Sequence, residues 1–225
     1  ATLGDERTRR GVFDAVGAAL AVFGDKKVKN GLRLNKPAGL AVDGAGTVFA
    51  ADANNKRVVK LSPSGILLAE FGKGQLKKPV AVALTPGKVL VADAQTGEVV
   101  VFADSGALLS RVALPPAVGP DTDPEEPRPM ALAADSSGKF WVADARGGRV
   151  LRYGPDLTLE QTLPGFARPE GVAVSPSGAC LAVSDAETGK IRTFDAALGA
   201  QLAVFGENEL HRPAQLAFNQ AGDLL

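Results

Sequence analysis

The chain has 225 residues, with 25 Lys and Arg against 25 Asp and Glu, so its formal net charge is +0. This balance excludes a uniformly basic nucleic-acid binder and an acidic disordered tail. Hydrophobic residues make up 45% of the chain and aromatic residues only 5%, while there are 26 Gly and 15 Pro. The composition therefore predicts a core of many small side chains with frequent turns.

No apolar run approaches the roughly 20 residues that a membrane-spanning helix needs, and no signal peptide is recognisable at the start. A soluble globular protein is expected. The single cysteine, Cys180, excludes an internal disulfide and lies in an apolar run, which favours a buried strand position over a nucleophile. The chain begins with Ala1, which is compatible with processing, excision from a longer chain or an incomplete chain.

An internal repeat organises the chain. Each copy begins with a basic residue, a proline and a short apolar run, and the prolines are Pro37, Pro79, Pro129, Pro169 and Pro213. Their spacings are 42, 50, 40 and 44 residues. A second marker, Ala-Asp or Ser-Asp, follows about fifteen residues after each of the first four prolines. Spacings of this length are typical of propeller blades.

The first complete unit divides into four short apolar runs, at residues 38–42, 47–51, 57–61 and 66–71. Turns rich in Gly and Asn separate the runs, which suits hairpin connections because these residues accept positive φ. No segment shows a sustained apolar period of 3.6, so helices are not expected. The predicted fold class is all-β, a β-propeller of four-stranded antiparallel blades.

The two ends of the chain match complementary parts of one blade. Residues 10–24 resemble residues 190–206, the outer two strands of a unit, whereas residues 210–225 resemble inner strands. We therefore predict one propeller domain over residues 1–225, in which residues 1–24 supply the outer strands and residues 210–225 the inner strands of a split blade. This arrangement has five blades of about 45 residues. The alternative is a six-bladed propeller from which one blade is missing.

The unit from Leu34 to Leu61, which ends later in Phe71-Gly72, resembles an NHL repeat. The resemblance covers almost the whole chain and departs from the family at the name-giving segment, which is Asn55-Lys56-Arg57 in the first copy but Gly147-Gly148-Arg149 in the third. It implies a propeller, usually of six blades. Such propellers serve as protein-interaction platforms, as RNA-binding domains or, in related folds, as lyases or lactone hydrolases. Only the residues of the site can distinguish these functions.

The recurring aspartates are the first candidate site, at Asp52, Asp93, Asp144 and Asp185. Carboxylates clustered at one end of a propeller can bind a cation or act as acid and base. A catalytic residue is expected once, however, and not once per blade. We therefore predict that these aspartates are structural caps, which accept backbone N–H bonds in the turn after each second strand.

Reactive side chains are few. The chain has one histidine, His211, in a loop beside a proline, and it contains no Gly-rich phosphate-binding motif. No Ser-His-Asp or Cys-His arrangement can be assembled with confidence from these residues. The sequence thus predicts no catalytic residues, no metal site and no cofactor, with an enzyme conceivable only through carboxylates.

Charge is distributed unevenly along the chain. Residues 1–78 carry 14 Lys and Arg against 7 Asp and Glu, whereas residues 79–225 carry 11 and 18. Loops that enter first strands and loops that join second to third strands emerge on the same face of a propeller. The predicted basic face consists of Arg7, Arg9, Arg10, Lys26, Lys27, Lys29, Arg33, Lys36, Lys56, Arg57, Lys73, Lys77 and Lys78.

Two binding interpretations follow. The basic face could bind RNA, but the phenylalanines recur at equivalent strand positions, which indicates packing and leaves no exposed aromatic residue for base stacking. Residues 115–129, with six prolines and four acids, form either a stiff loop or a segment that docks a partner.

The sequence as a whole predicts a non-catalytic scaffold propeller that binds protein partners within a larger assembly. RNA binding through the basic face is the first alternative, and a lactone-hydrolase or lyase-like enzyme is the second.

Overall fold

The computed structural model describes residues 10–13, 19–22, 32–117, 126–206 and 209–225. Four sheets of four antiparallel strands make up most of this part of the chain, and in each sheet the strands lie in sequence order. The first sheet comprises β3 (Pro37–Val42), β4 (Val48–Asp52), β5 (Arg57–Leu61) and β6 (Leu67–Phe71), and the second β7 (Pro79–Thr85), β8 (Lys88–Asp93), β9 (Glu98–Ala103) and β10 (Leu108–Ala113). The third comprises β11 (Pro129–Ala134), β12 (Phe140–Asp144), β13 (Arg149–Tyr153) and β14 (Leu159–Leu163), and the fourth β15 (Pro169–Val174), β16 (Cys180–Asp185), β17 (Lys190–Asp195) and β18 (Gln201–Phe205).

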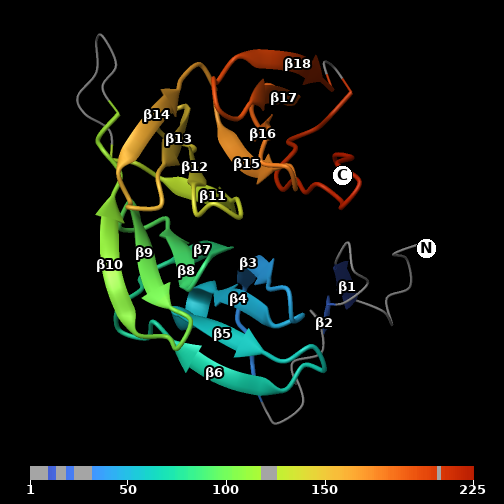
Figure 1. Cartoon of the computed structure of the whole chain (residues 1–225). Coiled ribbons are helices and arrows are strands. Elements are labelled where there is room, and N and C mark those ends of the chain that lie inside the picture. Colours follow the sequence, from blue (N-terminus) through green and yellow to red (C-terminus); the bar gives the residue numbers. More distant parts are fainter. Residues whose placement is uncertain (1–9, 14–18, 23–31, 118–125, 207–208) are drawn as a thin grey trace.

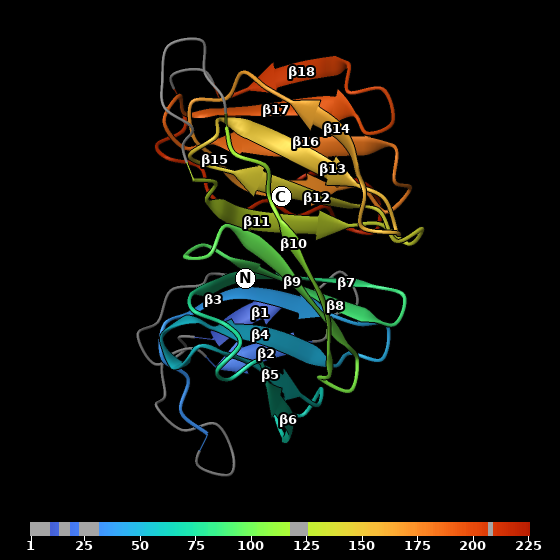
Figure 2. The ribbon, with the colours of Figure 1, turned by 90° about the vertical axis from the view of Figure 1, so that its left-hand side faces the viewer.

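The four sheets are fanned like blades around a centre. Figure 1 shows β6, β10, β14 and β18 on the outside of the fan and the C-terminal end on its open side. In Figure 2 the same blades are stacked in sequence order, from the first to the fourth. The predicted all-β propeller of four-stranded antiparallel blades is confirmed, with four complete blades and further, partial blade material.

That partial material comes from both ends of the chain. Strands β1 (Arg10–Phe13) and β2 (Ala19–Val22) pair with each other as a separate two-stranded sheet. Near the other end, Phe218 and Leu224 form an isolated antiparallel bridge. The split blade, and with it the assignment of residues 1–225 to one closed domain, stays a prediction.

Helical structure is limited to one short 3₁₀ turn, Ala53–Asn55, within the described ranges. The strand bounds of the first blade agree with the predicted runs to within one residue, because Pro and Gly mark where each strand can begin and end. In the part of the chain that the structure describes, no helix has the length and apolarity to cross a membrane.

The core lies between neighbouring blades. Phe71 of the first blade meets Phe102 of the second with 5.2 Å between ring centroids, and Phe166 meets Phe194 of the fourth blade at 5.8 Å. Small Val and Ala side chains fill the remaining space at each junction. The expectation that every phenylalanine is packed is wrong at Phe205, which is 51% exposed although it follows the same Phe-Gly pattern as Phe71.

Cys180 begins β16 and is half-buried. Desolvation by the surrounding residues raises the pKa of its thiol. The expected strand position is therefore observed, although the residue sits at the strand's first position and is less enclosed than the apolar run suggests.

Candidate functional site

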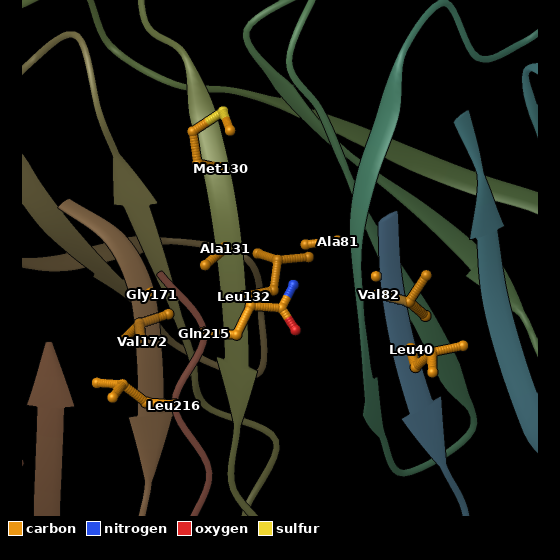
Figure 3. A pocket seen from close by; sticks show the side chains of 11 residues that line it. Leu40, Ala81, Val82, Met130, Ala131, Leu132, Gly171, Val172, Gln215 and Leu216 are labelled. Carbon is orange, nitrogen blue, oxygen red and sulfur yellow. The ribbon is translucent and has the colours of Figure 1, made fainter. Parts of the chain in front are cut away.

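The innermost strands surround one central pocket with a volume of about 100 Å³ (Figure 3). Each of the four blades and the C-terminal segment contributes to it, through Gly39, Leu40, Ala81, Val82, Met130, Ala131, Leu132, Gly171, Val172, Gln215 and Leu216. Gln215 supplies the only polar side chain of this lining. Because β3, β7, β11 and β15 are edge strands of their sheets, they also present backbone N–H and C=O groups that no partner strand satisfies.

The C-terminal segment contacts both the fourth and the first blades. The side-chain amide of Gln215 donates to the carbonyl oxygen of Ala38 at 3.3 Å, and the Ser184 hydroxyl donates to the carbonyl oxygen of Ala214 at 2.5 Å. The chain that follows Pro213 therefore lies beside β15 and reaches β3, which brings a fifth inner segment to the pocket.

One basic residue stands immediately before the proline of each inner segment. We call this set the axial ring, and it consists of Lys36, Lys78, Arg128, Arg168 and Arg212. Since a strand rises roughly 3.3 Å per residue, the ring lies about 10 Å along the segments from the residues that line the pocket. Each inner segment thus follows a cationic residue, although none of the five lines the central pocket.

The buried aspartates hold the backbone of this ring. A carboxylate oxygen of Asp93 accepts the N–H of Lys78 at 2.9 Å, and the Lys78 carbonyl in turn accepts the N–H of Ala94 at 3.0 Å. In the next blade Asp144 accepts the N–H of Arg128 at 2.7 Å. The third and fourth blades repeat the pattern, whereas in the first blade Asp52 binds the residue before Lys36. Each carboxylate is 0–1% exposed, so the cationic loop is anchored from inside the fold.

Arg57 shows how the same carboxylates also bind side chains. Its Nε donates to Asp52 at 2.8 Å and its Nη1 to Glu70 at 2.6 Å. Burial lowers the pKa of Arg57, but the hydrogen bonds to both carboxylates outweigh this effect and the pKa is raised. Arg57 was predicted as a residue of the basic face, and its guanidinium is already occupied by two acids.

Asp185 is expected to make folding sensitive to acid. Burial raises the pKa of this carboxyl, but the N–H groups of Ala167 and Arg168, at 2.8 and 3.0 Å, and two more in the following turn outweigh burial and lower it. A depressed folded-state pKa stabilises the protein above the unfolded value of about 3.9 and loses this effect as the pH falls through the folded value.

The measurement is the free energy of unfolding of the wild type and of Asp185→Asn between pH 7 and pH 3. The difference in unfolding free energy between the two proteins should begin to narrow near pH 4, where the carboxyl of the unfolded wild type takes up a proton, and should narrow further as the pH falls toward the lowered folded-state pKa. A difference in unfolding free energy that stays constant from pH 7 to pH 3 would contradict the lowered pKa of Asp185.

The other predicted basic residues are spread widely. Arg7, Arg9, Lys26, Lys27 and Lys29 lie outside the described residues, and Arg10 lies in β1, where only the backbone is described. The exposed members are Arg33, Lys36, Lys56, Lys73, Lys77 and Lys78. Lys36 and Lys78 belong to the axial ring, so the structure draws together only part of the predicted set.

A second hollow, of about 340 Å³, lies on the same face between the second and third blades. We call it the interblade hollow, and its lining is Lys78, Ala94, Gln95, Glu126, Pro127, Arg128 and Arg146. Three cations and one carboxylate meet here. Within the described ranges, none of these four charged side chains forms a hydrogen bond or ion pair with another residue.

Asp144 positions two of the three cations. It accepts the N–H of Arg128 and, at 3.1 Å, the N–H of Gly147, which directly follows Arg146 in the turn between β12 and β13. The sequence-based prediction missed Arg128 and Arg146. The basic residue before each proline was the signal that could have revealed Arg128, whereas Arg146 has no equivalent in the other blades.

His211 is exposed, and among the residues that the structure describes no group of three His, Cys, Asp or Glu side chains is placed to hold a metal ion.

Comparisons with known proteins concern the whole fold and one repeat. The chain is similar to a solved streptogramin B lyase, with a TM-score of 0.65, 15% identity and coverage of 84% of this chain and 60% of that one. It is also similar to a selenomethionine-substituted virginiamycin B lyase from Staphylococcus aureus, with a TM-score of 0.65, 16% identity and coverage of 84% and 61%. The chain thus spans about 60% of the length of these proteins. No curated protein matches it in sequence.

The similarity contradicts the expectation of a non-catalytic protein-binding scaffold, because both of the solved propellers named above are lyases, and it favours the lyase-like alternative over that expectation. That expectation was based on the lack of a reactive set in the linear sequence. The folded chain brings Lys78, Glu126 and Arg146 to one hollow although they are far apart in the sequence, so a linear search could not group them.

Residues 34–61 match the family model described as NHL repeat. The match spans β3, β4 and β5, which are three strands of the first blade, and it agrees with the resemblance that the sequence shows. The chain is therefore a β-propeller that contains an NHL repeat.

Proposed function

We propose that this propeller is a lyase-type enzyme whose substrate binds in the interblade hollow. The observation that carries the proposal is one carboxylate, Glu126, placed among three cations that have no side-chain partner in the described chain. The similarity in fold to two lyases supports an elimination reaction over other reactions of such a site.

The chemistry follows from the charges. The Glu126 carboxylate accepts a proton from a carbon next to a carbonyl or carboxylate group of the substrate. The electron pair of the broken C–H bond forms a double bond as the leaving group departs with its own pair, and the proton on Glu126 can return to that leaving group. Negative charge builds up on the carbonyl oxygen during the step, and Lys78, Arg128 and Arg146 stabilise it.

The backbone at two of the three cations is held before the substrate arrives. Arg128 is held through its backbone by Asp144, and Lys78 is held in the same way by Asp93. Donors that need no reorganisation during the reaction stabilise a developing charge most effectively. The hollow therefore favours a substrate with an acidic or carbonyl group near the bond that breaks.

Glu126→Gln is expected to lower kcat by about 10²- to 10⁴-fold, the usual contribution of a general base. The first probes are virginiamycin B, because one of the similar structures is a virginiamycin B lyase, and a panel of small hydroxy acids, with products followed by mass spectrometry. Elimination splits a bond without adding water, so the product masses should sum to the substrate mass, whereas hydrolysis adds one water.

Glu187→Gln is the matched control. Glu187 is exposed and stands two residues after Asp185, as Arg146 stands two residues after Asp144, but it does not line the hollow. Its replacement should leave turnover unchanged. Products that have gained water, no product from any probe, or an equal effect of both substitutions would each contradict the proposal.

A further inference from the structure

The interblade hollow has two walls, which come from different blades and each carry positive charge. Lys78 and Gln95 belong to the second blade, whereas Arg128 and Arg146 belong to the third. We propose, on the basis of the lyase function proposed above, that the substrate is a small hydroxydicarboxylate that spans the hollow. One of its carboxylates binds Lys78, and the other binds Arg128 and Arg146.

The charge of the lining fits an anion with two negative charges. Three cations less one carboxylate leave a formal charge of +2 at the hollow, and none of these four side chains is paired within the described ranges. A dicarboxylate balances this excess. Cations that line a concave site attract anions, and a carboxylate that accepts from Lys or Arg forms charge-assisted hydrogen bonds.

Each wall is fixed from inside its own blade. The buried carboxylate of Asp93 accepts the N–H of Lys78 at 2.9 Å and the N–H of Gln95 at 3.0 Å. In the third blade, Asp144 accepts the N–H of Arg128 at 2.7 Å. Because these two anchors belong to different blades, the cations of the two walls have separate supports. This arrangement suits a ligand with two separate acidic groups better than one compact anion.

Glu126 lies where the two blades meet. Pro127, which follows it, packs against the turn of the second blade, since a Cβ on Gly97 would lie 3.0 Å from the Pro127 carbonyl oxygen and 3.1 Å from its Cγ. The next residue, Arg128, leads into the third blade. The Glu126 carboxylate therefore lines the hollow beside the middle of a ligand that spans both walls.

This placement accounts for an elimination. Glu126 accepts the proton from the carbon next to one carboxylate, and the electron pair of that C–H bond forms a C=C bond. The C–O bond on the adjacent carbon breaks, and the hydroxide takes the proton from Glu126 and leaves as water. The cations of one wall stabilise the charge that builds up on the first carboxylate. Gln95 has an amide that both donates and accepts, so it can bind the hydroxyl. Malate is the simplest acid with these groups.

The binding test uses the complete chain and succinate, which has both carboxylates but no hydroxyl to eliminate, with affinity measured by calorimetry. Succinate should bind about tenfold more tightly than butyrate, which has one carboxylate on the same number of carbons. It should also bind more tightly than sulfate, a dianion too compact to reach both walls. Added salt should weaken succinate binding, because screening weakens exposed charge interactions. Equal binding of butyrate or sulfate, or no binding of succinate, would overturn the two-wall site.

Variants then locate the ligand. Lys78→Gln and Arg146→Gln, each at an exposed side chain, should weaken succinate binding about tenfold, the value of one charge-assisted hydrogen bond, so that succinate binds no more tightly than butyrate does. Lys73→Gln is the control, because Lys73 is an exposed cation that does not line the hollow. It should change the dissociation constant by less than about twofold. An equal loss of affinity in the Lys73 and Lys78 variants would overturn the proposed site.

Glu126→Gln separates the ligand class from the reaction. Removal of its negative charge should leave succinate binding at least as tight as in the wild type, while conversion of malate should fall about 10²- to 10⁴-fold. Succinate binding without elimination from malate would overturn the lyase function and leave the dicarboxylate site standing. Elimination from another probe that depends on Glu126, without a preference for succinate over butyrate, would overturn the substrate class alone.

Discussion

Asp144→Ala is expected to lower the free energy of unfolding by about 3–5 kcal/mol, the usual cost of removing one partner of a buried ion pair. The Asp144 side chain is fully buried, and its carboxylate accepts the Nε–H of Arg149 at 3.0 Å as well as the N–H groups of Arg128 and Gly147. Alanine leaves the Nε–H of Arg149 and the two backbone N–H groups without this buried acceptor, whereas the Nη groups of Arg149 keep the carbonyl oxygens of Pro115 and Pro116. Urea denaturation of the two proteins measures the difference.

Asp104→Ala is the control for this experiment. Asp104 forms an ion pair with Lys60 at 3.0 Å, but its side chain is 64% exposed. Surface pairs of this kind contribute about 0–1 kcal/mol, so the variant should unfold close to the wild type. If Asp144→Ala were no more destabilising than Asp104→Ala, the buried aspartates would not be the anchors that hold the axial ring.

Gly171→Ala is expected to disrupt the junction between the fourth blade and the C-terminal segment. A Cβ at this position would lie 1.7 Å from the carbonyl oxygen of Ala214 and 2.5 Å from the Ser184 hydroxyl. Backbone atoms cannot yield as a flexible side chain can, so the segment that carries Gln215 must move away. Overpacking of this kind costs about 1–3 kcal/mol.

Gly44→Ala provides the matched comparison, because a Cβ there would meet no atom within 4 Å and the residue does not have positive φ. The substitution should be neutral or slightly stabilising, since alanine restricts the unfolded chain. The unfolding midpoints of the wild type, Gly171→Ala and Gly44→Ala measure these effects. A Gly171 variant as stable as the Gly44 variant would show that the C-terminal segment does not pack against β15 as described.

Much of the fold could be predicted from particular residues. Pro37 and its four counterparts mark the start of each inner segment because proline fits the first residue of a strand, and the Gly-containing turns mark the ends of the hairpins. These are local effects with a regular period, so the sequence reveals them directly. The exposure of Phe205 could not be predicted, because it depends on what covers the outer face of the fourth blade.

The sites were only partly predictable. Arg57 counted as a free cation in the sequence, but its neighbours across the blade, Asp52 and Glu70, occupy it. Glu126 lies in a Pro-rich segment that was interpreted as a stiff loop or docking segment, and its position beside Lys78 follows from the packing of two blades. Ion pairing and pocket formation depend on distances between residues that are remote in the chain.

The sequence by itself determined the class of fold, the repeat and the residues that begin each inner segment, because each of these depends on local conformational preference and on a period that can be counted. Only the tertiary structure decided that the basic residues before the prolines surround one axis, that the aspartates after the second strands hold them, and that one carboxylate faces three cations between two blades. The physical reason is that a propeller brings equivalent positions of distant repeats to a common centre, so residues about 40 positions apart in the sequence come together around one axis.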